Sequence, residues 1–352
     1  MKLICHDDVT SYGARTMRRL LRAVVFLGMS VCALGNPPQA MAQQAQATLS
    51  LPGINIAFLS FYIADDLHLW RDRGLDVKSI MIVGAGSTNA LISGSVEFAI
   101  SSGSSITRAW AHGQKLRAMA TAINQTSEWV VIRKDIADAA HFDPHAPLSE
   151  RAKILKGKTI AMGGVGALPD AVLKAVASEA GIKSDEVVAT PMQPADFLAA
   201  FQRKLIDGFS NSMPYVQQVV LDGTGILVSD SAKGEPNRYS PISASLLMAR
   251  ADYCSGHSAI CTAMVDGVVA AIRLMHDDPK RAFAVMKSRF GTYDDKVLQA
   301  SFDVLEIISA NPPLTSVEEL QNGDLMSIAA GFLKPDEKLS DYQLLIDNSF
   351  IK

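Results

Sequence analysis

The chain has 352 residues, of which 48% are hydrophobic and 20% charged, and its 33 Lys/Arg and 36 Asp/Glu give a formal net charge of −3. This length allows two folded lobes. The acidic balance, without any Lys/Arg cluster outside the N-terminal region, argues against a nucleic-acid partner.

The first 42 residues have the order of a secretory signal peptide. A region with four arginines precedes the apolar run AVVFLGMSVCALG at residues 23–35, and the AMA at residues 40–42 matches a small-x-small cleavage site. Met1 and Met17 both remain possible starts. Valine directly before Cys32 is wrong for lipoprotein processing, and we find no second apolar run of membrane length. We therefore expect an exported, soluble protein that is not a lipoprotein.

Strand and helix patterns alternate from residue 54 onward. We predict strands at INIAFL (54–59), DVKSIMIV (76–83) and VEFAIS (96–101), with helices at FYIADDLHLWRDRG (61–74) and STNALISGS (87–95). Short links between strand, helix and strand imply parallel pairing with right-handed crossovers.

The same order returns roughly a hundred residues later, as a repeat of one βαβαβ unit would. The second set of predicted strands is KTIAMG (158–163), EVVATPM (186–192) and IDGFSNS (206–212), and its helices are LPDAVLKAVASEAG (168–181) and PADFLAAFQRK (194–204). Two such units predict two similar α/β lobes rather than one large sheet.

Two stretches are predicted to cross between the lobes, with hinges at residues 133–139 and 236–243. These crossings place residues 43–134 and 243–352 in lobe 1 and residues 135–242 in lobe 2. The tail from Ser258 is mostly helical, and we expect it to pack on the first lobe.

Cys254 and Cys261 are the two cysteines that remain after cleavage. In an oxidising compartment, their spacing of seven favours a disulfide over two free thiols.

Three patterns that suggest catalysis or cofactor binding are each incomplete. GAGSTN at residues 84–89 lacks the third glycine and the acidic residue of a dinucleotide fingerprint. Ser104 lacks both the glycine of a nucleophile elbow and a histidine base. His141, Asp143 and His145 stand in a polar loop with no second ligand cluster, which is typical of a turn. We expect no enzyme activity, no metal and no cofactor.

Small residues gather where predicted strands end and helices begin. Ligands of parallel α/β sheets bind at these strand ends, where free N–H groups and helix dipoles favour anions. Five such junctions in two matching lobes predict a ligand-binding cleft rather than ordinary helix caps: residues 60–62, 84–87, 101–105, 163–166 and 211–214.

Three segments resemble the periplasmic substrate-binding proteins of ABC importers, in the nitrate/sulfonate/taurine group. They are LHLWRDRGLDVKSI (67–80), GAGSTNALISGSVEFAISSGSSITRAWAHGQKLRAMATA (84–122) and LKGKTIAMGGVGALPDAVL (155–173). The resemblance covers about residues 52–275. It implies a type II-like, two-lobed fold in which each lobe is a mostly parallel sheet flanked by helices, with a helical C-terminal tail.

The resemblance also implies a ligand site, a function and partners. The expected ligand-binding residues are Ser60, Phe61, Tyr62, Ser87, Ser102, Ser104, Ser105, Gly164, Val165, Gly166, Asn211, Ser212 and Pro214. The expected solute is a small organic or inorganic anion of the sulfonate, carboxylate or nitrate class, delivered by a monomer to a membrane permease and its ATPase. No arginine lies in these loops, although Arg108 and Lys158 lie close in sequence, so a larger organic acid is as compatible as nitrate.

Two other functions remain open at this stage. The family also resembles the pyrimidine-precursor synthases of thiamin biosynthesis, which are enzymes, although their cysteine-rich motif is missing here. A third possibility is a module that presents a bound solute to a membrane kinase.

Overall fold

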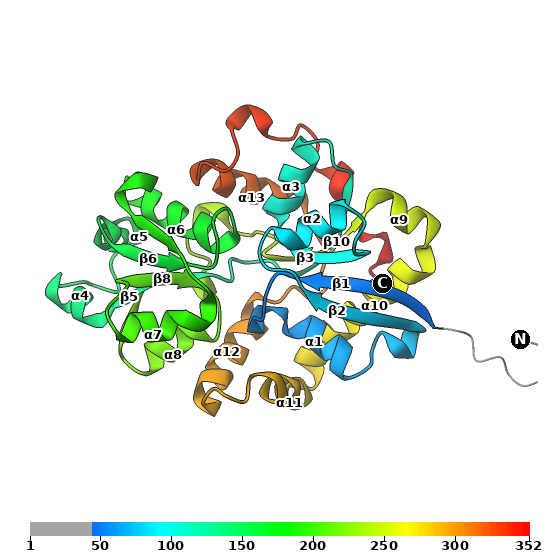
Figure 1. Cartoon of the computed structure of the whole chain (residues 1–352), viewed down its shortest axis with the longest axis horizontal. Helices are drawn as coiled ribbons and strands as arrows, with labels where there is room; N and C mark the ends of the chain where they lie inside the picture. Colours follow the sequence, from blue (N-terminus) through cyan, green and yellow to red (C-terminus); the bar gives the residue numbers. More distant parts are fainter. Residues whose placement is uncertain (1–43) are drawn as a thin grey trace, which may run out of the picture. The chain divides into compact units, whose positions relative to one another are not determined.

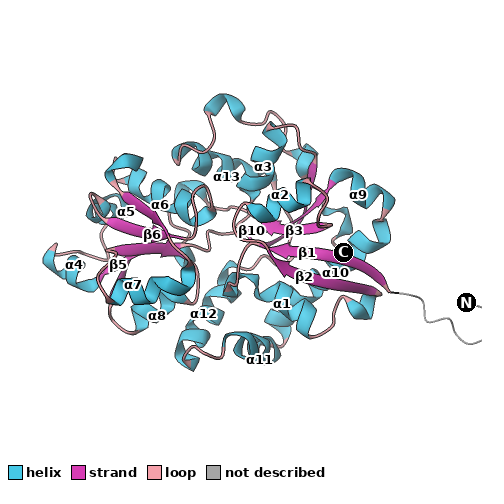
Figure 2. Ribbon diagram, viewed as in Figure 1, coloured by secondary structure: helices cyan, strands magenta, loops and turns pink. Residues whose placement is uncertain are grey.

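The computed structural model describes residues 44–352, so the predicted signal peptide, residues 1–42, lies outside the described part (Figure 1). Residues 44–352 form one compact unit by their contacts. It contains two five-stranded sheets, each flanked by helices (Figure 2).

The first sheet has the strand order β2-β1-β3-β10-β4. Strand β1 pairs in parallel with β2 and β3, whereas β10 is antiparallel to both β3 and β4. The strands are β1 (Ala45–Leu51), β2 (Leu75–Met81), β3 (Phe98–Ser101), β4 (Leu116–Ile123) and β10 (Ser245–Arg250).

The second sheet repeats this arrangement in the order β7-β6-β8-β5-β9. Strand β6 pairs in parallel with β7 and β8, and β5 is antiparallel to β8 and β9. The strands are β5 (Trp129–Arg133), β6 (Thr159–Met162), β7 (Val188–Pro191), β8 (Gly208–Asn211) and β9 (Gly225–Ser229). The predicted pair of similar α/β sheets is thereby confirmed.

In each sheet, the fourth strand in spatial order is antiparallel to its neighbours. It is the first strand that the chain forms after a crossing between the lobes. β10 follows the second set of strands in the chain but completes the first sheet, and β5 follows the first set but completes the second sheet. The first crossing therefore lies between the end of β4 at Ile123 and Trp129, and not at residues 133–139 as the sequence suggested. The apolar run of β5 predicted a strand, but only its pairing with β8 shows to which sheet it belongs.

The predicted strand at residues 54–59 is wrong, because the first strand lies earlier, at β1. The side chain of Asn55 accepts a hydrogen bond from the Ala57 backbone N–H at 2.7 Å, which turns the chain into a short 3₁₀ helix, η1 (Ile56–Phe58). Helix α1 (Leu59–Asp66) continues directly from it. The pattern INIAFL alternates like a strand, but Asn55 caps a helix instead.

Helices cover both sheets. The first lobe has α1, α2 (Gly86–Ile92) and α3 (Gly103–Ala111). The second lobe has α4 (Lys134–Ala139), α5 (Leu148–Arg151), α6 (Leu168–Glu179), α7 (Phe197–Gln202) and α8 (Tyr215–Leu221). The tail contains α9 (Ala251–Gly256), α10 (Ser258–Asp277), α11 (Pro279–Phe290), α12 (Asp295–Ile308) and α13 (Val317–Ala329). The sequence pattern did not predict α4, α5, α8 and α9.

The tail contacts both lobes, and not the first lobe alone. Helix α10 packs against α1, whereas α12 contacts α8 and α13 contacts both α3 and α6. By length and composition α10 could cross a membrane, contrary to our reading of the sequence. Ten of its residues are nevertheless buried inside the protein, as in a core helix.

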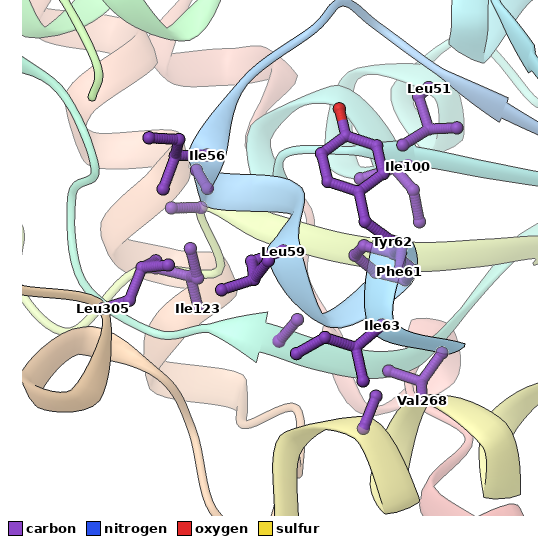
Figure 3. Packing of buried hydrophobic residues seen from close by; sticks show 14 of the residues in the cluster. Leu51, Ile56, Leu59, Phe61, Tyr62, Ile63, Ile100, Ile123, Val268 and Leu305 are labelled. Atoms are coloured by element: carbon purple, nitrogen blue, oxygen red, sulfur yellow. The ribbon is translucent and has the colours of Figure 1, made fainter. Parts of the chain in front are cut away.

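The core beside α1 explains why this helix is largely apolar. Figure 3 shows Phe61, Tyr62 and Ile63 of α1 among buried side chains that come from distant parts of the chain, including Val268 of α10. Burying a large apolar side chain contributes about 1.5–3 kcal/mol, so these side chains mainly stabilise the lobe.

The predicted disulfide is confirmed. It joins Cys254 of α9 to Cys261 of α10. Between them, the ring of His257 stacks on Tyr253, with 4.4 Å between the ring centroids.

Candidate ligand-binding site

A cavity of about 430 Å³ lies where the strands of both sheets end. Its lining follows the carboxyl ends of β1, β2 and β3 in the first sheet and of β6, β7 and β8 in the second. The lining positions are 52–55, 57, 58, 81, 83–85, 101, 102, 105, 108, 127, 128, 163, 166–169, 193–195, 211, 215 and 244. Strand ends of this kind are the usual ligand site of parallel α/β sheets.

The start of α3 forms one wall of this cavity. Ser102 and Ser105 line it, and the Ser102 hydroxyl lies 2.8 Å from that of Ser104 and 3.1 Å from that of Ser105. The Gly103 N–H donates to the Ser243 carbonyl at 2.7 Å, and a Cβ at this glycine would lie 2.9 Å from a methyl of Leu320. Glycine is therefore needed here for close packing, and this packing fixes the helix start.

Ser104 does not line the cavity, although it lies between two residues that do. Its hydroxyl is buried and pairs with that of Ser102, while its backbone packs near Gly323 of α13. Among the described residues, Ser104 therefore has a structural contact with α13, and its hydroxyl is paired with another hydroxyl rather than with a histidine.

Arg108 places a positive charge at the cavity. It projects from the last turn of α3, and its Nη2 donates to the carbonyl oxygen of Gly166, 3.3 Å away in the loop after β6. Burial lowers the pKa of Arg108, and the charge of Asp324 partly offsets this effect. A guanidinium remains protonated in proteins, so the cavity carries a fixed cation. Lys158 does not line the cavity.

Glu128 is a titratable residue of the same lining. It lies in the first crossing, directly before β5, and is 6% exposed. Its backbone carbonyl accepts the hydroxyl of Ser231, but no described residue gives its Oε2 a hydrogen bond. Burial raises the pKa of Glu128 well above its usual range.

The loop after β6 forms the opposite wall. The Gly166 N–H donates to Asp170 Oδ2 at 2.9 Å, and Asp170 is in turn 3.3 Å from the Lys174 ammonium. Gly166 has a φ of +74°, a conformation that favours glycine. Asn211, at the end of β8, holds its side chain by accepting the Ser212 N–H at 2.7 Å. The wall is therefore fixed by its own hydrogen bonds.

Four of the thirteen expected ligand-binding residues line the cavity: Ser102, Ser105, Gly166 and Asn211. Ser104, Gly164, Ser212 and Pro214 are their neighbours in sequence, but they are outside the lining. Val165 is 71% exposed and also outside it.

The other four expected residues are buried in the first lobe. Ser60, Phe61 and Tyr62 lie within α1 because the strand expected before them is displaced, although the Tyr62 hydroxyl accepts the N–H of Asn55, a lining residue, at 3.3 Å. Ser87 is fully buried, with its hydroxyl 2.7 Å from that of Ser50. Of these four residues, Tyr62 contacts the cavity lining through its hydrogen bond with Asn55.

Several lining residues have no predicted role in the sequence. Asn55 and Phe58 lie in the predicted strand at residues 54–59, and Glu128 lies outside every predicted element and junction. Gln193 and Tyr215 lie one or a few residues beyond a predicted strand end. Their closeness to predicted strand ends is a signal that could have identified Gln193 and Tyr215. The burial of Glu128 depends on tertiary packing and has no such signal.

The predicted turn at residues 141–145 is present. The Asp143 carboxylate accepts the His145 backbone N–H at 2.9 Å, as in an ordinary polar turn. Within residues 44–352, no group of three or more His, Cys, Asp or Glu side chains is arranged to hold a metal ion.

Three solved structures share this fold. The alkanesulfonate-binding protein SsuA from Xanthomonas axonopodis pv. citri, bound to MOPS, is 16% identical with a TM-score of 0.68 over 87% of this chain and 99% of that one. The periplasmic nitrate-binding protein NrtA from Synechocystis PCC 6803 is 14% identical, with a TM-score of 0.60 over 83% and 84% of the two chains.

The third structure, a Candida albicans protein described as having the generic periplasmic binding protein fold, is 13% identical with a TM-score of 0.64 over 87% and 96%. This chain therefore has the periplasmic binding protein fold, as the sequence predicted. A comparison with curated protein sequences found no significant match.

A family model described as NMT1/THI5-like matches residues 55–282, which is well over half of the chain. The matched range contains both sheets except β1, together with most of the cavity lining. The chain belongs to the NMT1/THI5-like family.

Proposed function

We propose that this protein is the solute-binding component of an ABC importer, exported to the periplasm, which captures a small organic anion and delivers it to a permease. The observation that carries the proposal is a cavity between the strand ends of two sheets, with the Arg108 guanidinium in its lining. Hinge movement at the two crossings would close the lobes on the solute. The protein acts as a monomer and as a carrier rather than an enzyme.

The polar groups of the first wall favour an anion. Arg108 supplies a full positive charge, and the hydroxyls of Ser102 and Ser105 supply hydrogen-bond donors at the start of a nine-residue helix. A helix start also attracts anions through the positive end of the helix dipole, although the N–H groups of Gly103 and Ser105 are already paired within the protein.

The size and the remaining lining favour an organic anion over nitrate. A volume of about 430 Å³ is in the range of cavities that bind organic ligands. Phe58, Leu168 and Tyr215 supply apolar surface around it. A small inorganic ion has no apolar surface to bury there, whereas the apolar part of an organic carboxylate or sulfonate would be removed from water.

A thermal-shift screen with organic carboxylates, sulfonates and nitrate tests this proposal, because a solute that binds the folded state raises its melting temperature. We expect at least one organic anion to raise the melting temperature of the wild type. Ser105→Trp should abolish the shift by filling the cavity, whereas Ser255→Trp, on an exposed position of α9, should preserve it. The proposal fails if no solute shifts the wild type, or if Ser105→Trp responds in the same way as the wild type.

A further inference from the structure

Helix α13 contacts the elements that carry both walls of the cavity. It lies between α3 and α6 and packs against both of them (Figure 1). Helix α3 supplies Ser105 and Arg108 to the first wall, and the loop of the opposite wall leads directly into α6. Asp170 of α6 also accepts the Gly166 N–H and so holds that loop in place. The position of α13 is therefore linked to the separation of the two walls.

The first half of α13 is fixed to the first lobe and to the second crossing by buried polar contacts. The Glu319 carboxyl accepts the Ser243 hydroxyl at 2.7 Å and the Thr121 hydroxyl at 3.2 Å. One turn further along, Asp324 accepts the hydroxyl of Thr107 in α3. Breaking such contacts would leave buried polar groups unpaired, at a cost. This half of α13 therefore moves with the first lobe.

The second half of α13 contacts the second lobe through apolar side chains. Met326 is buried in the same hydrophobic cluster as Val176 of α6. Just beyond the helix, the Lys174 ammonium lies over the Phe332 ring, 4.2 Å from its centroid. The buried Ser327 hydroxyl of this half has no hydrogen-bond partner within residues 44–352. Apolar contacts are not directional, so this half can separate from α6 without breaking the kind of hydrogen bonds that fix the first half.

We propose that the contact between α13 and α6 is a releasable joint that regulates the cavity. While the contact is made, the two walls keep the separation seen here, and when it breaks, the lobes move apart and the cavity opens. Met326 and Phe332 act by positioning the second lobe, since neither lines the cavity. The inference rests on the proposed function, because it names what regulates the same site. Weakening the contact lowers the fraction of molecules that can bind, and with it the apparent affinity for a solute.

Distance measurements on the solute-free protein test this inference. Spin labels at Asn89→Cys in α2 and Val165→Cys in the opposite wall, both exposed positions, report the separation of the lobes by electron paramagnetic resonance. The two native cysteines of residues 44–352 are joined in the disulfide, so the labels attach only at the introduced positions. Met326→Ala and Phe332→Ala should each add a population at longer distance. Met326→Leu, which nearly conserves the side-chain volume, should keep the wild-type distribution.

Met286→Ala and Phe283→Ala are the matched controls, because they truncate the same two side chains in α11, which packs against α1 and α10. Both controls should keep the wild-type distribution. Phe332 is only partly buried, so Phe332→Ala should fold and decides the matter even where Met326→Ala does not. The inference is overturned if Phe332→Ala leaves the distances unchanged, or if the controls lengthen them equally. Because no solute is added, failure of the proposed function would appear in the thermal-shift screen and not in these distances.

Discussion

At the scale of single residues, the burial of Glu128 predicts how the stability of the ligand-free protein depends on pH. Burial raises the pKa of Glu128 in the folded protein above the value of 4.5 that it has when exposed. As the pH rises above about 4.5, the carboxyl loses its proton in the unfolded chain but keeps it in the folded protein. The free energy of unfolding therefore falls until the pH reaches the folded-state pKa. Below the unfolded pKa both states are protonated and the penalty disappears.

Glu128→Gln should therefore increase the free energy of unfolding at neutral pH by about 1–3 kcal/mol, because the amide does not titrate and the folded variant no longer has to resist ionisation. The gain should shrink toward zero at about pH 4, where the wild-type carboxyl is protonated in both states. Denaturant unfolding of both proteins at several pH values measures the difference. A variant that is less stable than the wild type at neutral pH, or a gain that does not change with pH, contradicts the assignment of Glu128 as a buried, unpaired acid.

At the scale of elements, the disulfide between α9 and α10 stabilises the fold and not the cavity. Cys254 and Cys261 are seven residues apart, and neither lines the cavity. Closing a loop of this length stabilises a protein by about 2–3 kcal/mol, mainly by restricting the unfolded chain. The double variant Cys254→Ala/Cys261→Ala should unfold at lower denaturant concentration by this amount, and its affinity for a solute should equal that of the wild type. Unchanged stability, or a loss of affinity, would disprove this separation.

Some elements and site residues could be predicted from the sequence, and others could not. Helix α3 and the Ser102 and Ser105 positions were predictable because small polar residues follow an apolar strand directly. Residues 60–62 were misplaced because Asn55 turns the chain into a helix where the hydrophobic pattern allowed a strand. An error in one element therefore moved three expected ligand-binding residues from the cavity into the core.

At the scale of the whole molecule, the repeated βαβαβ order predicted two sheets, but not how they exchange strands. Each sheet is completed by a strand from beyond a crossing, β10 in one and β5 in the other. Pairing between such distant segments has no local signal in the sequence. The same holds for Glu128, whose burial depends on how the crossing packs between the lobes, and for Arg108, which reaches Gly166 across the cavity.

The central claim is that solute binds in this cavity through Arg108. Isothermal titration with an anion identified in the screen tests it, comparing the wild type with Arg108→Ala and with Lys158→Ala, a cation close in sequence to the second wall but outside the lining. Removing a partner of a buried charged hydrogen bond costs about 2–5 kcal/mol, so Arg108→Ala should weaken binding by more than about 10-fold. Lys158→Ala should bind like the wild type. Equal affinities for all three proteins would contradict the account.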